Sequence, residues 1–317
     1  MLFRTPELTD LEIGVVSQVE KLKIDLKYLT GQPRRWTGLL RRNALARAVQ
    51  GSTSIEGYNV TFEDAIAAVE GDAPEVDPKD ENWLAVAGYR MALTFVLQKA
   101  EDPYFKHSEE VLKSLHFMMV SWDLTKNPGR WRPGAIFVRN DATGEIIYEA
   151  PPAGEVQELT AELVAELNSP ASSPTIVQAA MAHLNLVMIH PFSDGNGRMA
   201  RGLQTLVLAT RGVIASQFSS IEEYLGRNTQ AYYAVLAEVG AGEWHPERDA
   251  RPWLRFCIRA HYHQALILLR RSREMNRIWD AVEELVQGLK LPERMIPALV
   301  DAAYTRRVRN TTYRAAA

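Results

Sequence analysis

The chain has 317 residues, of which 46% are hydrophobic and 24% charged, as in a globular protein with a full hydrophobic core. Its net charge of −3 argues against a nucleic-acid coat protein, and no apolar stretch approaches the roughly 18 residues of a membrane-spanning helix. Cys257 is the only cysteine, which excludes intrachain disulfides and thiolate zinc clusters. The first ten residues lack the features of a signal peptide, so a reducing, cytoplasmic location is expected.

Helical periodicity dominates the first third of the chain. Gly57 supplies a helix end, Thr61 opens a capping box, and Ser108 is expected to cap a further helix. The four helices expected before that cap cover residues 11–29, about 39–55, 61–70 and 81–100.

One part of the chain has strand character instead. Residues 135–138 and 145–148 are rich in β-branched and aromatic side chains and flank a turn-rich stretch, which predicts a β-hairpin at about 135–148. Because this hairpin lies among helices, the predicted fold class is all-α. The later helices are expected at 155–168, 173–189, 197–210, 229–239 and 250–274.

Three short helical segments are predicted after residue 273, and together they resemble a helix-turn-helix or winged-helix appendage. From Lys290 onward six basic residues face two acidic ones, a local charge of +4. This basic count is small for a DNA-binding module and no wing is visible, so packing or homodimer formation is favoured and DNA binding is left open. The expected segments are Ile278–Val286, Glu293–Tyr304 and Val308–Ala317.

The segment most informative about chemistry is HPFSDGNGRMAR, at residues 190–201. Its pattern predicts a helix that ends at a histidine, a glycine-punctuated turn, and a second helix that opens near Gly197. Gly195 and Gly197 allow the backbone to approach a ligand closely and to point N–H groups at it. The start of the second helix favours an anion, so the segment is suited to binding phosphate.

Four side chains of this segment supply the chemistry of group transfer. His190 can act as a base near neutral pH, and Asp194 is an oxygen ligand of the kind that Mg²⁺ takes beside nucleotide phosphates. Arg198 and Arg201 can clamp phosphate oxygens. A base, a metal ligand, an anion cradle and two cations are the parts that transfer of a phosphoryl-type group requires.

The same segment resembles the signature of the Fic family, HPFx(D/E)GNGRxxR, and matches it at every defined position. The resemblance implies a Fic-type helical domain that transfers AMP from ATP, with Mg²⁺, to a Ser, Thr or Tyr hydroxyl of a target protein or of the chain itself. It implies His190 as the base and Asp194 as the metal ligand. The residues implied to bind nucleotide are Gly195, Asn196, Gly197, Arg198 and Arg201, of which Gly197 is a lysine in the phosphorylating branch of the family.

Ser52 and Glu56 lie one turn apart and resemble the family's inhibitory motif, (S/T)xxxE(G/N), in its N-terminal position. The implied role is an ion pair between Glu56 and Arg201 that occupies the place of the γ-phosphate. The structural alternative is a solvent-facing glutamate at a helix end.

The hairpin at 135–148 resembles the family's flap, which holds a target segment by strand addition. Tyr232 and Tyr233 resemble an aromatic pair near the adenine, although two tyrosines on a helix are also typical of a core. The expected division is an N-terminal region at 1–110 with an inhibitory helix at about 39–57, a catalytic core at 111–272, and an appendage at 273–317. Three alternative functions remain: removal of AMP from a modified protein, transfer of a nucleotide other than AMP, and regulation through DNA binding.

Overall fold

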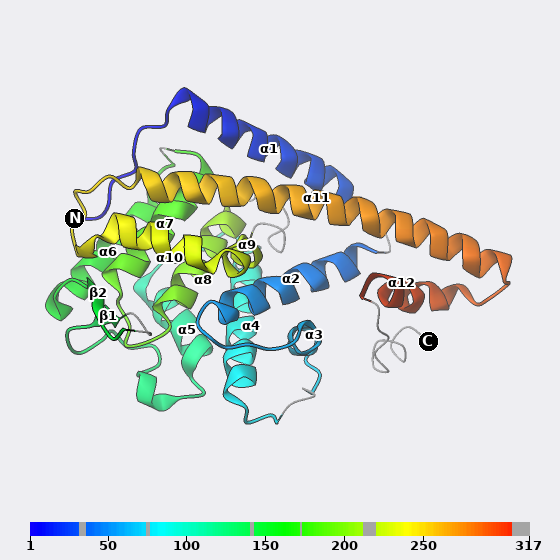
Figure 1. The fold of residues 1–317 in the computed structure, drawn as a ribbon, viewed down its shortest axis with the longest axis horizontal. Coiled ribbons are helices and arrows are strands. Elements are labelled where there is room, and N and C mark those ends of the chain that lie inside the picture. The colour runs from blue at the N-terminus through cyan, green and yellow to red at the C-terminus, as the bar shows by residue number, and fades with distance from the viewer. Residues whose placement is uncertain (32–35, 74–76, 140–142, 172, 212–219, 306–317) are drawn as a thin grey trace.

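The computed structural model describes residues 1–31, 36–73, 77–139, 143–171, 173–211 and 220–305, and it confirms the all-α class (Figure 1). Within these ranges, no helix combines the length and the apolar character that crossing a membrane requires. The helices are α1 (Asp10–Gly31), α2 (Thr37–Ser54), α3 (Phe62–Glu70), α4 (Glu81–Lys99), α5 (Glu109–Val120), α6 (Val156–Asn168), α7 (Thr175–Ile189), α8 (Asn196–Thr210), α9 (Glu222–Arg227), α10 (Thr229–Gly240), α11 (Arg251–Gly288) and α12 (Ile296–Thr305).

Local capping signals fix several helix ends where the sequence predicts them. Thr61 Oγ1 accepts a hydrogen bond of 3.1 Å from the Asp64 N–H at the start of α3. Ser108 Oγ accepts one of 3.2 Å from the Val111 N–H at the start of α5. The turn after α2 closes at Gly57, whose φ of +84° is open to glycine without strain.

Helices α7 and α8 lie at the centre of the molecule and carry the two halves of the motif. Helix α7 is buried on almost every face, and α4, α5, α6 and α11 pack around the pair. Trp253 on α11 is fully buried and donates its indole N–H to the Ala180 carbonyl of α7 over 2.7 Å. The motif is therefore built on the buried centre of the fold.

Helix α11 corrects the predicted helix boundaries near residue 273. It continues unbroken over 38 residues and runs beside α1 before it reaches α12 (Figure 1). The helices predicted at 250–274 and Ile278–Val286 are thus one helix, and the expected start of the appendage falls inside it. No Gly or Pro interrupts the chain between Trp253 and Gln287, so nothing local stops the helix.

The end of the described chain packs onto the helix that precedes Glu56. Val300 of α12 shares a second hydrophobic cluster with Leu40 of α2 and Trp279 of α11. An ion pair of 2.5 Å joins Arg42 of α2 to Asp301 of α12. The predicted segment Glu293–Tyr304 corresponds to α12 and the short turn before it, whereas the helix predicted at Val308–Ala317 lies outside the described residues.

The predicted hairpin is present, and a third strand joins it. Strands β1 (Phe137–Arg139) and β2 (Ile146–Glu149) pair antiparallel, with an irregularity after Val138. The two-residue strand β3 (Gly242–Glu243) pairs parallel to β2, which makes β2 the central strand in the order β1-β2-β3. A strand of two residues has no readable periodicity, so the sequence did not predict it. The edge of β1 away from β2 is the hairpin edge that no described strand covers.

Candidate active site

The motif folds into a tight loop between α7 and α8. His190 ends α7 with a left-handed φ of +51°, and Gly195 has a φ of +73° immediately before α8. Phe192 is fully buried beneath the loop. The Asn196 side chain closes the loop by accepting from the Phe192 N–H over 2.9 Å and donating to its carbonyl over 2.8 Å. Asn196 can therefore offer a phosphate its backbone N–H rather than its amide side chain.

His116 of α5 supports this loop from below, a role that the sequence alone does not reveal. Its ring stacks on that of Phe192 with the centroids 3.8 Å apart. Its Nδ1 accepts from the Gly129 N–H over 2.9 Å, so its Nε2–H donates to the Asp194 carbonyl over 3.0 Å. Burial lowers the pKa of His116 to about 4, which keeps the ring neutral, as these two bonds require.

The ring of His190 is oriented as a base. Its Nδ1 lies 3.1 Å from the Val187 carbonyl, which can only accept, so Nδ1 carries the proton and Nε2 keeps its lone pair. Burial, aided by the charge of Arg132, lowers the pKa of His190 to about 4. The ring is therefore neutral at physiological pH and can accept a proton through Nε2.

A cavity of about 400 Å³ brings the predicted site residues together. The motif lines it with His190, Asp194, Gly195, Asn196, Gly197 and Arg201 but not with Arg198, and residues of the hairpin also line it. Tyr232 and Tyr233 also line it, with different roles. Tyr232 is buried and its hydroxyl lies 3.0 Å from Nε2 of His183, whereas the half-exposed Tyr233 donates to the Ile55 carbonyl over 3.0 Å.

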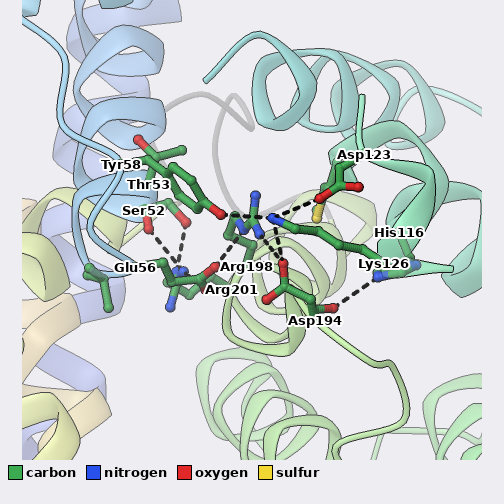
Figure 2. A network of polar contacts seen from close by, with 12 residues as sticks. Ser52, Thr53, Glu56, Tyr58, His116, Asp123, Lys126, Asp194, Arg198 and Arg201 are labelled. Carbon is green, nitrogen blue, oxygen red and sulfur yellow. Dashed lines mark hydrogen bonds and ion pairs between the residues drawn. The ribbon is translucent and has the colours of Figure 1, made fainter. Parts of the chain in front are cut away.

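Glu56 enters this cavity and binds both motif arginines (Figure 2). Its Oε1 lies 2.7 Å from Nη2 of Arg201, and its Oε2 lies 2.6 Å from Nε of Arg198. Both guanidinium groups are fully buried. Burial by itself would raise the pKa of Glu56, but the two arginine charges outweigh it and lower the pKa. The resemblance implies the contact with Arg201; the contact with Arg198 is an addition from the structure.

The rest of the inhibitory motif holds Arg201 in place for this contact. Ser52 is buried, and its Oγ accepts from Nε of Arg201 over 2.7 Å while its carbonyl accepts from Nη2 over 2.9 Å. Gly197 leaves room for the carboxylate, because a Cβ atom there would lie 2.6 Å from Oε1 of Glu56. A longer side chain at position 197 is incompatible with Glu56 in this position.

Asp194 already holds a cation, the ammonium group of Lys126 (Figure 2). Nζ of Lys126 lies 3.1 Å from Oδ2 of Asp194 and donates to the Tyr58 hydroxyl over 3.0 Å. Nη2 of Arg198 is 3.5 Å from the same carboxylate oxygen. No described group of three or more His, Cys, Asp or Glu side chains could hold a metal ion by itself. A single carboxylate that already attracts a cation fits a Mg²⁺ ion that arrives with nucleotide phosphates.

Sequence reasoning missed Lys126 and Tyr58 as parts of this site. Lys126 is an isolated lysine at the end of a one-turn 3₁₀ helix, and its partner Tyr58 is 68 positions away in the chain. The only signal in the sequence is that Tyr58 follows the inhibitory motif directly.

Comparisons with known proteins agree with this geometry. The model of the Fic/DOC family matches residues 106–208. Protein adenylyltransferase fic-1 of Caenorhabditis elegans is 38% identical over 263 residues, which are 80% of this chain and 46% of that protein. Protein adenylyltransferase Fic of Nematostella vectensis is 27% identical over 233 residues, 69% of this chain and 47% of that protein. The chain thus spans less than half the length of these curated relatives.

Solved structures show the same fold. A Fic family protein from Desulfovibrio desulfuricans G20 superposes with a TM-score of 0.71 at 22% identity, covering 95% of this chain and 89% of that one. Fic-1 from C. elegans superposes with a TM-score of 0.64 at 23% identity, covering 83% of this chain and 73% of that one. The motif, the loop that it forms and the family match identify residues 106–208 as a Fic/DOC domain.

Proposed function

We propose that this chain is a protein adenylyltransferase that transfers AMP from ATP to a Ser, Thr or Tyr hydroxyl. The observation that carries the proposal is that the basic imidazole nitrogen of His190, the Asp194 carboxylate and the buried Arg201 line one cavity. The names of the relatives point to the same activity. The target oxygen bonds to the α-phosphorus, the bond from that phosphorus to pyrophosphate breaks, and the proton of the hydroxyl passes to His190.

Residues of this chain divide that task. Nε2 of His190 takes the proton, and the hydrogen bond from Nδ1–H to Val187 keeps the ring in the tautomer that can do so. The N–H groups at the start of α8 bind phosphate oxygens, helped by the positive end of the helix. Asp194 would hold Mg²⁺, which neutralises charge on the pyrophosphate.

We further propose that the chain rests in an inhibited state. In this state Glu56 occupies the two guanidinium groups that would bind the outer phosphates, and Lys126 occupies the carboxylate that would bind the metal. ATP has to displace one anion and Mg²⁺ has to displace one cation before the site is complete. Because both displacements are needed, the resting state is harder to leave than one held by a single ion pair.

The flap would hold a segment of the target protein. Its available edge is β1, because β2 is covered on both sides by β1 and β3. Phe137 and Val138 of β1 line the cavity, so a strand paired to β1 lies next to the motif. A target hydroxyl on such a strand can reach the base.

The test is intact-mass analysis of the purified chain and of a cell lysate after incubation with Mg²⁺ and one nucleotide at a time. With ATP, the Glu56→Gly variant is expected to add one AMP to itself or to a lysate protein. His190→Ala in the same background is the matched control and should add none while still binding ATP, because a general base contributes about 10²- to 10⁴-fold. Labelling by UTP, CTP or GTP in preference to ATP would refute AMP as the transferred group.

A further inference from the structure

The segment between α5 and the flap is fastened to the catalytic loop at several points. The backbone N–H of Arg132 donates to the Pro191 carbonyl over 2.9 Å. The neighbouring Trp131 ring lies against Phe192, with the centroids 4.9 Å apart. The segment that leads into the flap therefore packs against the loop that follows His190.

Arg132 is the unusual member of this segment. Its side chain is buried, with 4% of its surface exposed. The guanidinium group donates to three backbone carbonyls: from Nε to His190 over 2.8 Å, from Nη1 to Gly134 over 2.7 Å, and from Nη2 to Pro151. None of the described carboxylates forms an ion pair with it. A buried cation without a counter-ion is costly, and three carbonyl acceptors in fixed directions compensate for it.

The three carbonyls belong to the residue proposed as the base and to the two ends of the flap. His190 carries the base, and its left-handed backbone directs its carbonyl toward Arg132. Gly134 lies shortly before β1, and Pro151 lies shortly after β2, so they are the two roots of the flap. One planar guanidinium group thus connects the base to both ends of the hairpin.

We propose that Arg132 is a positioning residue that fixes the flap and His190 relative to each other. This inference rests on the function proposed above, because the flap presents the target hydroxyl and His190 removes its proton. A displacement of about 1 Å between reacting groups can lower a rate by about 10²-fold. Arg132 does not line the cavity, and it contacts the motif loop at His190 and Pro191 rather than at the phosphate-binding start of α8, so its loss should leave nucleotide binding unchanged.

The experiment compares Arg132→Lys and Arg132→Met with Arg130→Met, all in the Glu56→Gly background. Arg130 is exposed in the same segment, so its variant controls for loss of a nearby charge. A lysine keeps the charge but cannot reach three carbonyls in one plane. We expect AMP transfer to fall about 10-fold or more for lysine and about 10²-fold for methionine, with the ATP dissociation constant changed less than about threefold.

A second readout separates positioning from a general loss of folding. Amide hydrogen exchange of β1 and β2 should accelerate in Arg132→Lys, while exchange in α7 and α8 remains slow. Guanidinium ion at a concentration that does not denature the protein should restore transfer to Arg132→Gly, and methylammonium should not. Transfer within threefold of the parent, or reduced transfer with unchanged hairpin exchange, overturns the proposal. A Glu56→Gly parent that transfers no nucleotide refutes the proposed function instead. In that case, amide exchange of the hairpin and the NMR shift of the His190 ring in the Arg132 variants decide whether Arg132 links the flap to His190.

Discussion

Removal of the Glu56 carboxylate should activate the enzyme, and the structure sets the size of the effect. In the proposed inhibited state, two charge-assisted hydrogen bonds, of 2.7 and 2.6 Å, must break before ATP can bind Arg201 and Arg198. Each such bond contributes about 1.5–3 kcal/mol. They share one carboxylate and so do not add fully. We therefore take about 3 kcal/mol for the pair, which corresponds to about 10²-fold in rate.

The assay is the initial rate of self-labelling at an ATP concentration well below saturation, where competition between the two anions is visible. Glu56→Gly should reach about 10² times the parent rate. Glu56→Gln should lie between them, because its amide oxygen can accept from one arginine but carries no charge. Arg201→Ala should not activate, since it removes a phosphate-binding group, and the double variant should be as slow as Arg201→Ala alone. A Glu56→Gly protein that is folded and labels at the parent rate would refute the inhibitory role of this carboxylate.

Three further predictions concern the base, the metal ligand and the inhibitory serine. As the proposed base, His190 acts in its neutral form, and burial lowers its pKa to about 4, so kcat/KM should stay constant as pH falls through 6.5 and decline only toward pH 4. Lys126→Met should lower the Mg²⁺ or Mn²⁺ concentration needed for half-maximal binding, because the metal no longer displaces an ammonium group from Asp194. Ser52→Ala should raise self-labelling by about 3- to 10-fold, because one of its two hydrogen bonds to Arg201 is lost.

Each of these has a direct check. A pH profile of the Glu56→Gly variant with its acidic midpoint near 6.5 would show that His190 titrates as an ordinary histidine or is not the base. Metal binding to Lys126→Met is followed by calorimetry, with Lys113→Met as the control, because the Lys113 ammonium group pairs with Glu110 and not with Asp194. Equal affinities in both would remove Lys126 from the metal site. A Ser52→Ala variant that labels more slowly than the parent would mean that Ser52 serves the active conformation instead.

Local sequence determined the features that depend on neighbouring residues. The caps at Thr61 and Ser108 could be predicted because the hydroxyl and the N–H that it binds are three positions apart. The helix–loop–helix of the motif could be predicted because its glycines and its apolar helix lie within one short segment. The hairpin could be predicted because its two strands flank one turn.

Tertiary structure decided the contacts that join distant segments. The resemblance implied one arginine as the partner of Glu56, but the carboxylate also binds Arg198, 142 positions away. How far Glu56 reaches into the site depends on how closely α2 approaches α9. A Cβ atom on Gly51 would lie 2.6 Å from the Glu222 carbonyl, so only glycine allows this close approach of the two helices. No periodicity in the sequence encodes such a distance.

The same reason explains the functional residues that the sequence did not reveal. No motif in the sequence marks Lys126, His116 or Arg132, and the contacts that define their roles reach partners 58 to 78 positions away. A side chain shows its chemistry in the sequence, but its pKa and its partners arise only where packing excludes water and brings separate segments together. The sequence by itself determined the motif and the class of reaction that it suits; the packing of α2, the flap segment and α7 around that motif decided which charges face each other in the resting state.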